Sequence, residues 1–313
     1  MGQVHQLITT HGFEEAKARA VAKLDRQCVE TAFAVMSDED QRIGIMHAGF
    51  SMTALPHKDI AETVWNRQGG NVKLRIDSGT DENGLAVGIP FGSIARMILL
   101  YLQTEAVKTR SREIELGRSM NRWLSSMGID NGGKSYKLVR EQSRRLSLCR
   151  LTFYRAAEEG THVTNGSFVR DAILPTRESD QLPLWREVIR LDESFYESLI
   201  SHPMPVLESA LRQIGSRSMA IDVYVWLAYR LHHLTAPTPI SWRSIYDQFG
   251  GGYAQFRQFK AKFKEPLALA LAAYPEAHVS ADDEGLMLYR VHPRKGPQCD
   301  IGSGAQSLRP MLA

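Results

Sequence analysis

The sequence predicts an α+β protein that contains two winged-helix domains in tandem. Two observations favour this fold: helical and alternating hydrophobic periodicities both occur, and the order helix, helix, turn, helix, hairpin occurs twice along the chain. With 313 residues, the chain is long enough for two domains with separate cores. The expected units are an N-terminal helical extension at 1–40, winged-helix domains at 41–192 and 193–293, and a disordered tail at 294–313.

Periodicity places the elements of the extension and the first domain. Apolar residues at three- and four-residue steps predict one helix from Phe13 to Val35. Alternating runs on either side of Gly69-Gly70 predict a hairpin. The other expected elements are a strand at Ile43–Met46, an apolar helix at Ser93–Val107, a basic helix after Gly133, wing strands at Leu151–Tyr154 and Gly166–Ile173, a strand at Arg186–Leu191 and a short helix at Ser194–Ile200.

The second domain shows the same order of elements. A strongly apolar stretch predicts a helix at Ala220–Leu234, and the Gly250-Gly251-Gly252 run predicts a turn between two further helices. Pro266 should kink or end the second of these helices. The remaining elements are a strand at Ile240–Trp242, helices at Ser244–Phe249 and Tyr253–Tyr274, and a hairpin at His278–Val291.

Positive charge is concentrated in one block of the chain. From Gly88 to Arg155 there are 13 basic and five acidic side chains, a local balance of +8, whereas the whole chain carries only +3. Such a block is the electrostatic footprint expected of a protein that binds a nucleic acid. A helical projection of its last helix places five cations away from the apolar arc: Lys134, Lys137, Arg140, Arg144 and Arg145. A solvated face, or a face toward an acidic partner, is the alternative.

The last helix before Pro266 offers a second candidate surface. Phe256, Phe259, Phe263 and Leu267 recur at steps of three and four, which is typical of a core stripe. Arg and Gln are the side chains that recognise guanine and adenine by paired hydrogen bonds in the major groove. The candidate DNA-binding residues here are Tyr253, Gln255, Arg257, Gln258 and Lys264. An ordinary amphipathic helix is the alternative.

The basic block also resembles a known family. The runs GIPFGS at 88–93 and TEAVKTRSREIELG at 104–117 are similar to the plasmid-encoded RepA replication initiators, and the likeness takes in Leu55–Lys58 upstream and Ala272–Pro275 downstream. The resemblance implies a protein that binds the plasmid origin, helps to open it and recruits the host initiator and helicase. It also implies an inactive dimer formed through the N-terminal domain. A winged-helix transcriptional repressor without a replication role is the alternative.

Signals for enzymatic chemistry are weak. The segment Gly128–Ser135 fits the phosphate-binding pattern G-x-x-x-x-G-K-[ST], but helical periodicity precedes it where that loop requires a strand, so a turn between helices is the preferred interpretation. No His pair has the spacing of a helical metal site, and no His-x-His run accompanies a nucleophilic Tyr. We therefore expect no enzymatic activity, no metal and no cofactor.

The composition favours a cytoplasmic bacterial protein. Cys28, Cys149 and Cys299 are odd in number and far apart, which argues against a disulfide framework. No apolar run approaches 20 residues, and the N-terminus lacks a signal peptide, so we expect no membrane partner.

Overall fold

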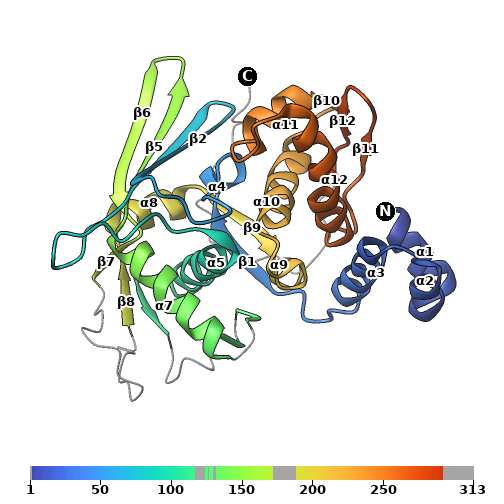
Figure 1. Cartoon of the computed structure of the whole chain (residues 1–313), viewed down its shortest axis with the longest axis horizontal. Coiled ribbons are helices and arrows are strands. Elements are labelled where there is room, and N and C mark those ends of the chain that lie inside the picture. The colour runs from blue at the N-terminus through green and yellow to red at the C-terminus, as the bar shows by residue number, and fades with distance from the viewer. Residues whose placement is uncertain (1, 117–123, 126, 130–131, 172–187, 292–313) are drawn as a thin grey trace.

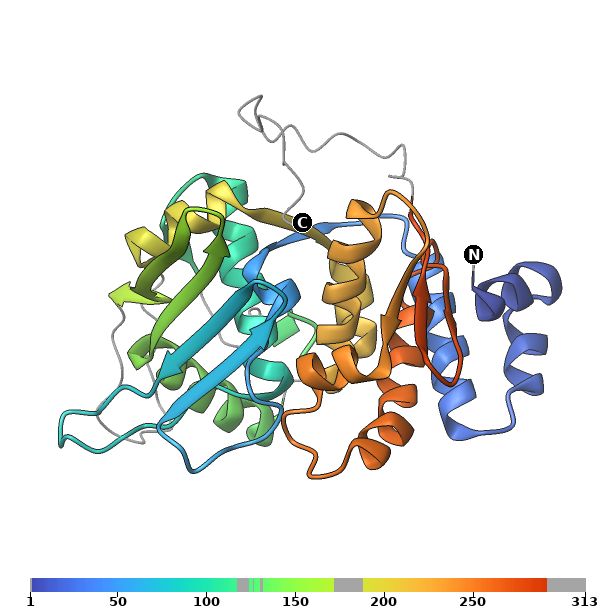
Figure 2. The same cartoon turned by 90° about the horizontal axis from the view of Figure 1, so that it is seen from above.

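The computed structural model describes residues 2–116, 124–125, 127–129, 132–171 and 188–291. The predicted α+β class is confirmed. Figures 1 and 2 show two bodies side by side, with three N-terminal helices at the far end of the second body. We call residues 43–201 the first half and residues 203–291 the second half. The disordered tail predicted at 294–313 lies outside the described residues.

The N-terminal extension is three helices rather than the one predicted. They are α1 (Gln3–His11), α2 (Phe13–Arg19) and α3 (Lys23–Met36). The chain leaves the helical conformation at Ala20, which has φ −76° and ψ 100°. This break lets α2 fold back, so that Ala16 and Ala32 become fully buried in a small core shared with Ala272. The apolar spacing continues across the break, which is why periodicity alone could not reveal it.

The larger sheet of the first half is antiparallel and has the strand order β2-β3-β5-β6. Its strands are β2 (Val64–Gly69), β3 (Val72–Asp77), β5 (Arg150–Ala157) and β6 (Gly160–Ser167). Leu74, Ile76 and Leu151 alternate with polar residues and face the core. The predicted hairpin at Gly69-Gly70 is confirmed, and Gly70 takes the left-handed φ of +56° that its turn requires.

Four helices and a second, small sheet complete the first half. The helices are α4 (Gly49–Met52), α5 (Gly92–Thr109) and α7 (Gly133–Leu148), and α8 (Glu193–Ser201) closes the half by packing against β6, α5 and β1. The small sheet has the order β4-β8-β7, with β4 (Glu113–Glu115), β8 (Val188–Leu191) and β7 (Val169–Asp171).

The long β5–β6 hairpin differs from the prediction. Its second strand was expected at Gly166–Ile173, but β6 runs from Gly160 to Ser167, and Val169–Asp171 is the separate strand β7. The turn occurs at Glu158-Glu159 and ends on Gly160, whose φ is +139°. Two glutamates are not a typical turn sequence, so only the glycine marked the turn.

The second half matches the predicted order closely. It contains β9 (Pro203–Leu207), α9 (Glu208–Ile214), α10 (Ser218–His233), β10 (Thr238–Ser241), α11 (Trp242–Phe249), α12 (Phe256–Ala272), β11 (Val279–Ala281) and β12 (Gly285–Leu288). Helix α12 passes through Pro266 and continues to Ala272, in agreement with the helix predicted at Tyr253–Tyr274, so the helix does not end at the proline. Leu267, Leu269 and Ala270 are buried beyond the proline, and this burial against α10 and α3 offsets the lost backbone hydrogen bond.

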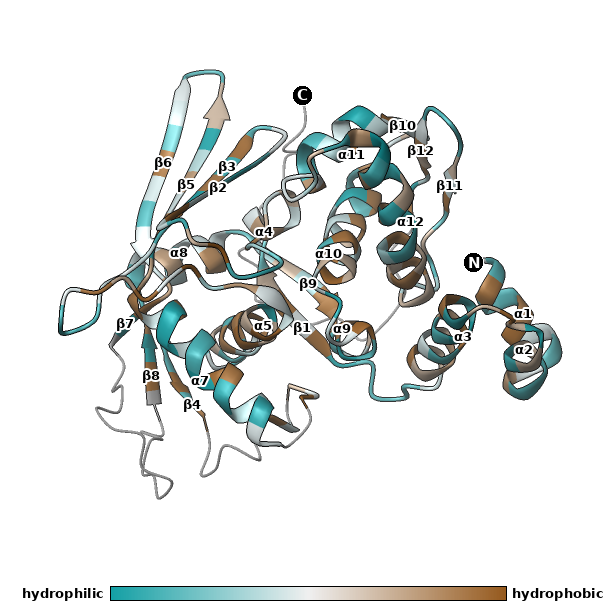
Figure 3. Ribbon diagram, viewed as in Figure 1, coloured by the Kyte–Doolittle hydropathy of each residue, from teal (hydrophilic) through white to brown (hydrophobic). Residues whose placement is uncertain are grey.

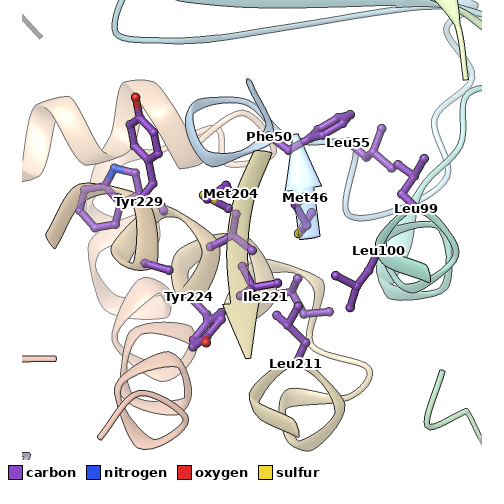
Figure 4. Close-up of a cluster of buried hydrophobic side chains, with 14 of the residues drawn as sticks. Met46, Phe50, Leu55, Leu99, Leu100, Met204, Leu211, Ile221, Tyr224 and Tyr229 are labelled. Carbon is purple, nitrogen blue, oxygen red and sulfur yellow. The ribbon is translucent and has the colours of Figure 1, made fainter. Parts of the chain in front are cut away.

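The two halves are joined along a broad seam. Strand β1 (Ile43–His47), from the start of the first half, pairs with β9 in an antiparallel register from Ile43↔Leu207 to His47↔Pro203. One hydrophobic cluster runs through both halves, and Figure 4 shows Met46 and Leu100 of the first half near Met204 and Ile221 of the second. The halves therefore share a core. No helix in the described part of the chain is long and apolar enough to cross a membrane.

Candidate nucleic-acid interface

Helix α7 presents a polar, cationic face to solvent. Val139, Gln142 and Leu146 are buried on its inner side, and Gln142 accepts a hydrogen bond from the backbone N–H of Phe91 at 2.8 Å. Figure 3 shows α7 as hydrophilic over most of its length. The exposed cations are Lys134, Lys137, Arg140 and Arg144. Four of the five cations predicted for this helix are therefore accessible to a large ligand.

The exposed cations differ in how far their charge is already balanced. Arg144 donates to Asp81 at 3.2 Å. Hydrogen bonds from the backbone N–H of Leu85, and to a lesser degree the guanidinium of Arg144, lower the pKa of Asp81, so the pair is ionised. Within the described ranges, Lys134, Lys137 and Arg140 form no ion pair. Those three charges remain free to attract an anion.

Arg145 was predicted to be an exposed cation, and this prediction is wrong. Its side chain is about one-tenth exposed, and its Nη1 donates to Asp59 Oδ1 at 2.6 Å and to the carbonyl of Ile89 at 2.9 Å, while Nη2 donates to Glu141 at 2.7 Å. Burial opposes its charge, but the two carboxylates outweigh this effect and raise its pKa. Its guanidinium also lies over the ring of Phe91. Arg145 holds the segment before α5, so we remove it from the candidate surface.

Arg96 belongs to the basic block by sequence but not to its surface. Its side chain is 4% exposed and forms a salt bridge with Asp222 of α10 at 2.6 Å. With Arg145, it removes two cations from the block of 13. The helical projection cannot detect either burial, since the partners Asp59 and Asp222 lie far away in the sequence.

The turn before α7 is built as the helix–turn–helix interpretation requires. Leu124 and Ser125 are helical, Gly128 takes a φ of +67°, and Gly133 opens α7. The described residues before the turn thus form helix rather than strand, as predicted. Residues 117–123, where most of the first helix of the motif was expected, lie outside the described residues.

Helix α12 also divides into a buried and an exposed side. Phe259, Phe263 and Leu267 are at most 5% exposed, which confirms the core stripe from Phe259 onward, whereas Phe256 is 38% exposed and does not belong to it. The opposite side of the first two turns is exposed and carries Gln255, Arg257, Gln258 and Lys264, together with the small Ala261. Tyr253 differs from the other predicted residues here, because its ring packs edge-on against Phe259 and is only partly exposed.

Both helices are on one side of the molecule. In Figure 2, α7 (green) and the turn that leads into α12 (orange) lie along the lower edge of the view. The exposed side of α7 carries cations suited to phosphates, and the exposed side of α12 carries Arg and Gln, which are suited to base edges.

In the described parts of the chain, no three His, Cys, Asp or Glu residues are close enough to hold a metal ion. A polar cavity of about 260 Å³ lies between β5, β6 and α8 and includes His47 and Arg155. Burial lowers the pKa of His47 to about 3, and this neutral ring is within hydrogen-bond distance of Ser198 at 2.9 Å.

Comparison with known proteins identifies the family. Residues 89–243, from the start of α5 into α11, match the family model described as "Plasmid encoded RepA protein". The match spans just under half of the chain, and over these residues the protein is similar to this RepA family. The match contains α7 and its basic face, and it confirms the resemblance seen in the RepA runs at 88–93 and 104–117. The similarity supports a protein of the plasmid RepA replication-initiator type.

Solved structures show a related fold. A crystal structure of "domain2 and domain 3 of RctB" is similar to this chain with a TM-score of 0.50 at 11% identity, over 78% of this chain and 99% of that one. A second structure, of RctB domains 2–3, gives a TM-score of 0.46 at 12% identity, over 73% of this chain and 82% of that one. A search of curated proteins finds no match.

Proposed function

We propose that the protein initiates plasmid replication by binding repeated duplex sites at the origin, helping to open the duplex and recruiting the host initiator and helicase. The observation that carries the proposal is the RepA match over residues 89–243, which contains the free cations of α7. We interpret α7 with the β5–β6 hairpin, and α12 with the β11–β12 hairpin, as the recognition helices and wings of two winged-helix modules.

Footprinting on the parent plasmid tests the initiator role. Protection of tandem repeats beside an AT-rich tract is the expected pattern. Protection of a single palindrome over a promoter would instead support the repressor, and protection of both would mean that the initiator also represses its own gene.

The two helices should divide the work of binding. The free charges of α7 attract any phosphate backbone, whereas the Arg257–Gln258 pair on α12 can form hydrogen bonds with base edges. General affinity and sequence preference would then reside on different helices, in different halves of the protein.

Substitutions on α12 should reduce sequence preference. We expect Arg257→Ala or Gln258→Ala to weaken binding to the cognate repeat by about 1–3 kcal/mol and to leave binding to scrambled duplexes almost unchanged. Fluorescence anisotropy with matched cognate and scrambled duplexes measures both constants.

Substitutions on α7 provide the contrasting set. Lys137→Ala and Arg144→Ala should weaken every duplex to a similar degree, and the effect should be smaller for Arg144 because Asp81 already shares its charge. A loss of preference from the α7 variants, with uniform weakening from the α12 variants, would reverse the assignment.

A homodimer is the proposed storage form. The sheet of the first half has two edge strands, β2 and β6. Helix α11 packs against β2, whereas β6 pairs only with β5 and exposes 45% of Val163, so we place the dimer contact at β6.

Light scattering tests this contact. We expect a concentration-dependent dimer that dissociates when a duplex with one repeat is added, and a Val163→Lys variant that remains monomeric. A monomer at every concentration, or a dimer that persists on one repeat, would contradict the proposal.

A further inference from the structure

Arg67 of β2 reaches across the seam to the turn between α11 and α12. Its side chain is 7% exposed, and its Nε has no hydrogen-bond partner among the described residues. The guanidinium lies against Gly251: a Cβ added there would be 2.1 Å from Nη1. A larger residue at 251 would therefore displace either the guanidinium of Arg67 or the turn.

The position of Arg67 is not explained by an ion pair. Asp222 is the acidic group that acts on it, and both oxygens of this carboxylate already accept hydrogen bonds from Arg96. The Cζ atom of Arg67 lies 5.8 Å from the centroid of the Trp65 ring, and this cation–π contact partly compensates for the missing carboxylate. A buried guanidinium without its own carboxylate is unfavourable for stability, so its retention calls for another role.

Neighbouring contacts fix the same turn to the first half. Helix α11 packs against β2, and Gln248 at its end donates to the carbonyl of Met52 at 3.4 Å. The turn then leads directly to Gln255 and to the first residues of α12. The first half thus supports the turn from which the exposed side of α12 projects.

We propose that Arg67 is a positioning residue for base recognition by α12. Through Gly251 it sets the direction in which α12 leaves the turn, so the first half contributes to sequence preference without contacting bases. The inference rests on the proposed function, since it assumes that α12 recognises a DNA sequence.

Two adjacent glycines provide a matched test. Neither Gly251 nor Gly252 has a positive φ, so alanine is compatible with both backbones. An added Cβ at Gly252 meets nothing within 4 Å, whereas at Gly251 it meets the guanidinium of Arg67. Gly251→Ala should therefore disrupt the contact between Arg67 and the turn, by displacing either the guanidinium or the turn, and Gly252→Ala should not.

The measured quantity is the ratio of the dissociation constants for a scrambled and a cognate duplex. We expect Gly251→Ala and Arg67→Ala each to reduce this ratio about 10-fold, and Gly252→Ala to leave it unchanged. The double variant should be no worse than Arg67→Ala, because the methyl group then has room. Thermal unfolding identifies variants that fail to fold, and Arg67→Met, which keeps the apolar stem, replaces Arg67→Ala in that case.

Three outcomes separate the possibilities. An unchanged ratio in folded Gly251→Ala and Arg67 variants would overturn the inference. Equal weakening of both duplexes by Arg67→Ala, with a shallower salt dependence, would also overturn it, because Arg67 would then be a phosphate contact. A wild-type protein that does not prefer the cognate repeat would refute the proposed function itself.

Discussion

Replacement of Asp222 by alanine is expected to destabilise the protein by about 3–5 kcal/mol, because it leaves the charge of Arg96 buried without a counter-ion. The carboxylate accepts from Arg96 Nε at 2.6 Å and from Nη2 at 2.7 Å, and the two side chains are only 10% and 4% exposed. The pair joins α5 of the first half to α10 of the second.

Without Asp222, Arg96 could not readily move its charge into solvent. Its remaining N–H groups donate to the carbonyls of Leu55, Pro56 and Gly92 at 2.7–3.2 Å, so the guanidinium cannot turn toward water without breaking three further bonds. Nearby His57 cannot replace the carboxylate, because an imidazole is either neutral or cationic; burial lowers its pKa to about 4, so it is neutral at pH 7.

Urea denaturation followed by circular dichroism measures the effect of Asp222→Ala. Asp283→Ala is the control, because Asp283 is fully exposed at the β11–β12 turn and its Lys260 ion pair is long, at 3.6 Å. The control should unfold like the wild type. A similar midpoint for Asp222→Ala and the control would show that the seam does not depend on this pair.

Binding of duplex DNA should depend steeply on salt. With about six phosphate contacts, affinity should fall by roughly three orders of magnitude between ~50 and ~200 mM salt, because each contact releases counterions from the duplex. The exposed cations available for these contacts are Lys134, Lys137, Arg140 and Arg144 on α7, with Arg257, Lys262 and Lys264 on α12.

Variants that each lack one cation show which residues contribute to the slope of this salt dependence. Removing one free cation, as in Lys137→Ala or Arg140→Ala, should reduce the slope by about one. Arg243→Ala serves as a control, because Arg243 is exposed on α11 but already pairs with Asp247 at 3.2 Å. A binding constant that hardly changes over this salt range would rule out phosphate contacts as the source of affinity.

The sequence predicts most elements whose pattern is local. The β2–β3 hairpin, α10 and the β11–β12 hairpin lie close to their expected places, since each carries its own periodicity and turn glycines. The break at Ala20 was missed, and the sequence left open whether α12 ends at Pro266, because packing decides both. Ala16 reaches its core only if α2 turns back, and Leu267 is buried only if α12 continues.

The candidate site was predictable to a similar extent. The helical projection found the exposed cations of α7 and the exposed side of α12. It misplaced Arg145, whose partners Asp59 and Phe91 come from other segments. The contact between Arg67 and Gly251 had no sequence signal, because a β-strand arginine and a turn glycine more than 180 positions apart give no pattern.

The pairing of β1 with β9 has a consequence for how the chain folds while it is being synthesised. Strand β1 leaves the ribosome early, but its only partner in the described structure, β9, follows at residues 203–207. The apolar side chains of β1 and α5 therefore remain exposed until β9 and α10 have been synthesised and can pack against them. We expect a nascent chain that stops before α10 to remain sensitive to proteases, because the core that the two halves share cannot yet form.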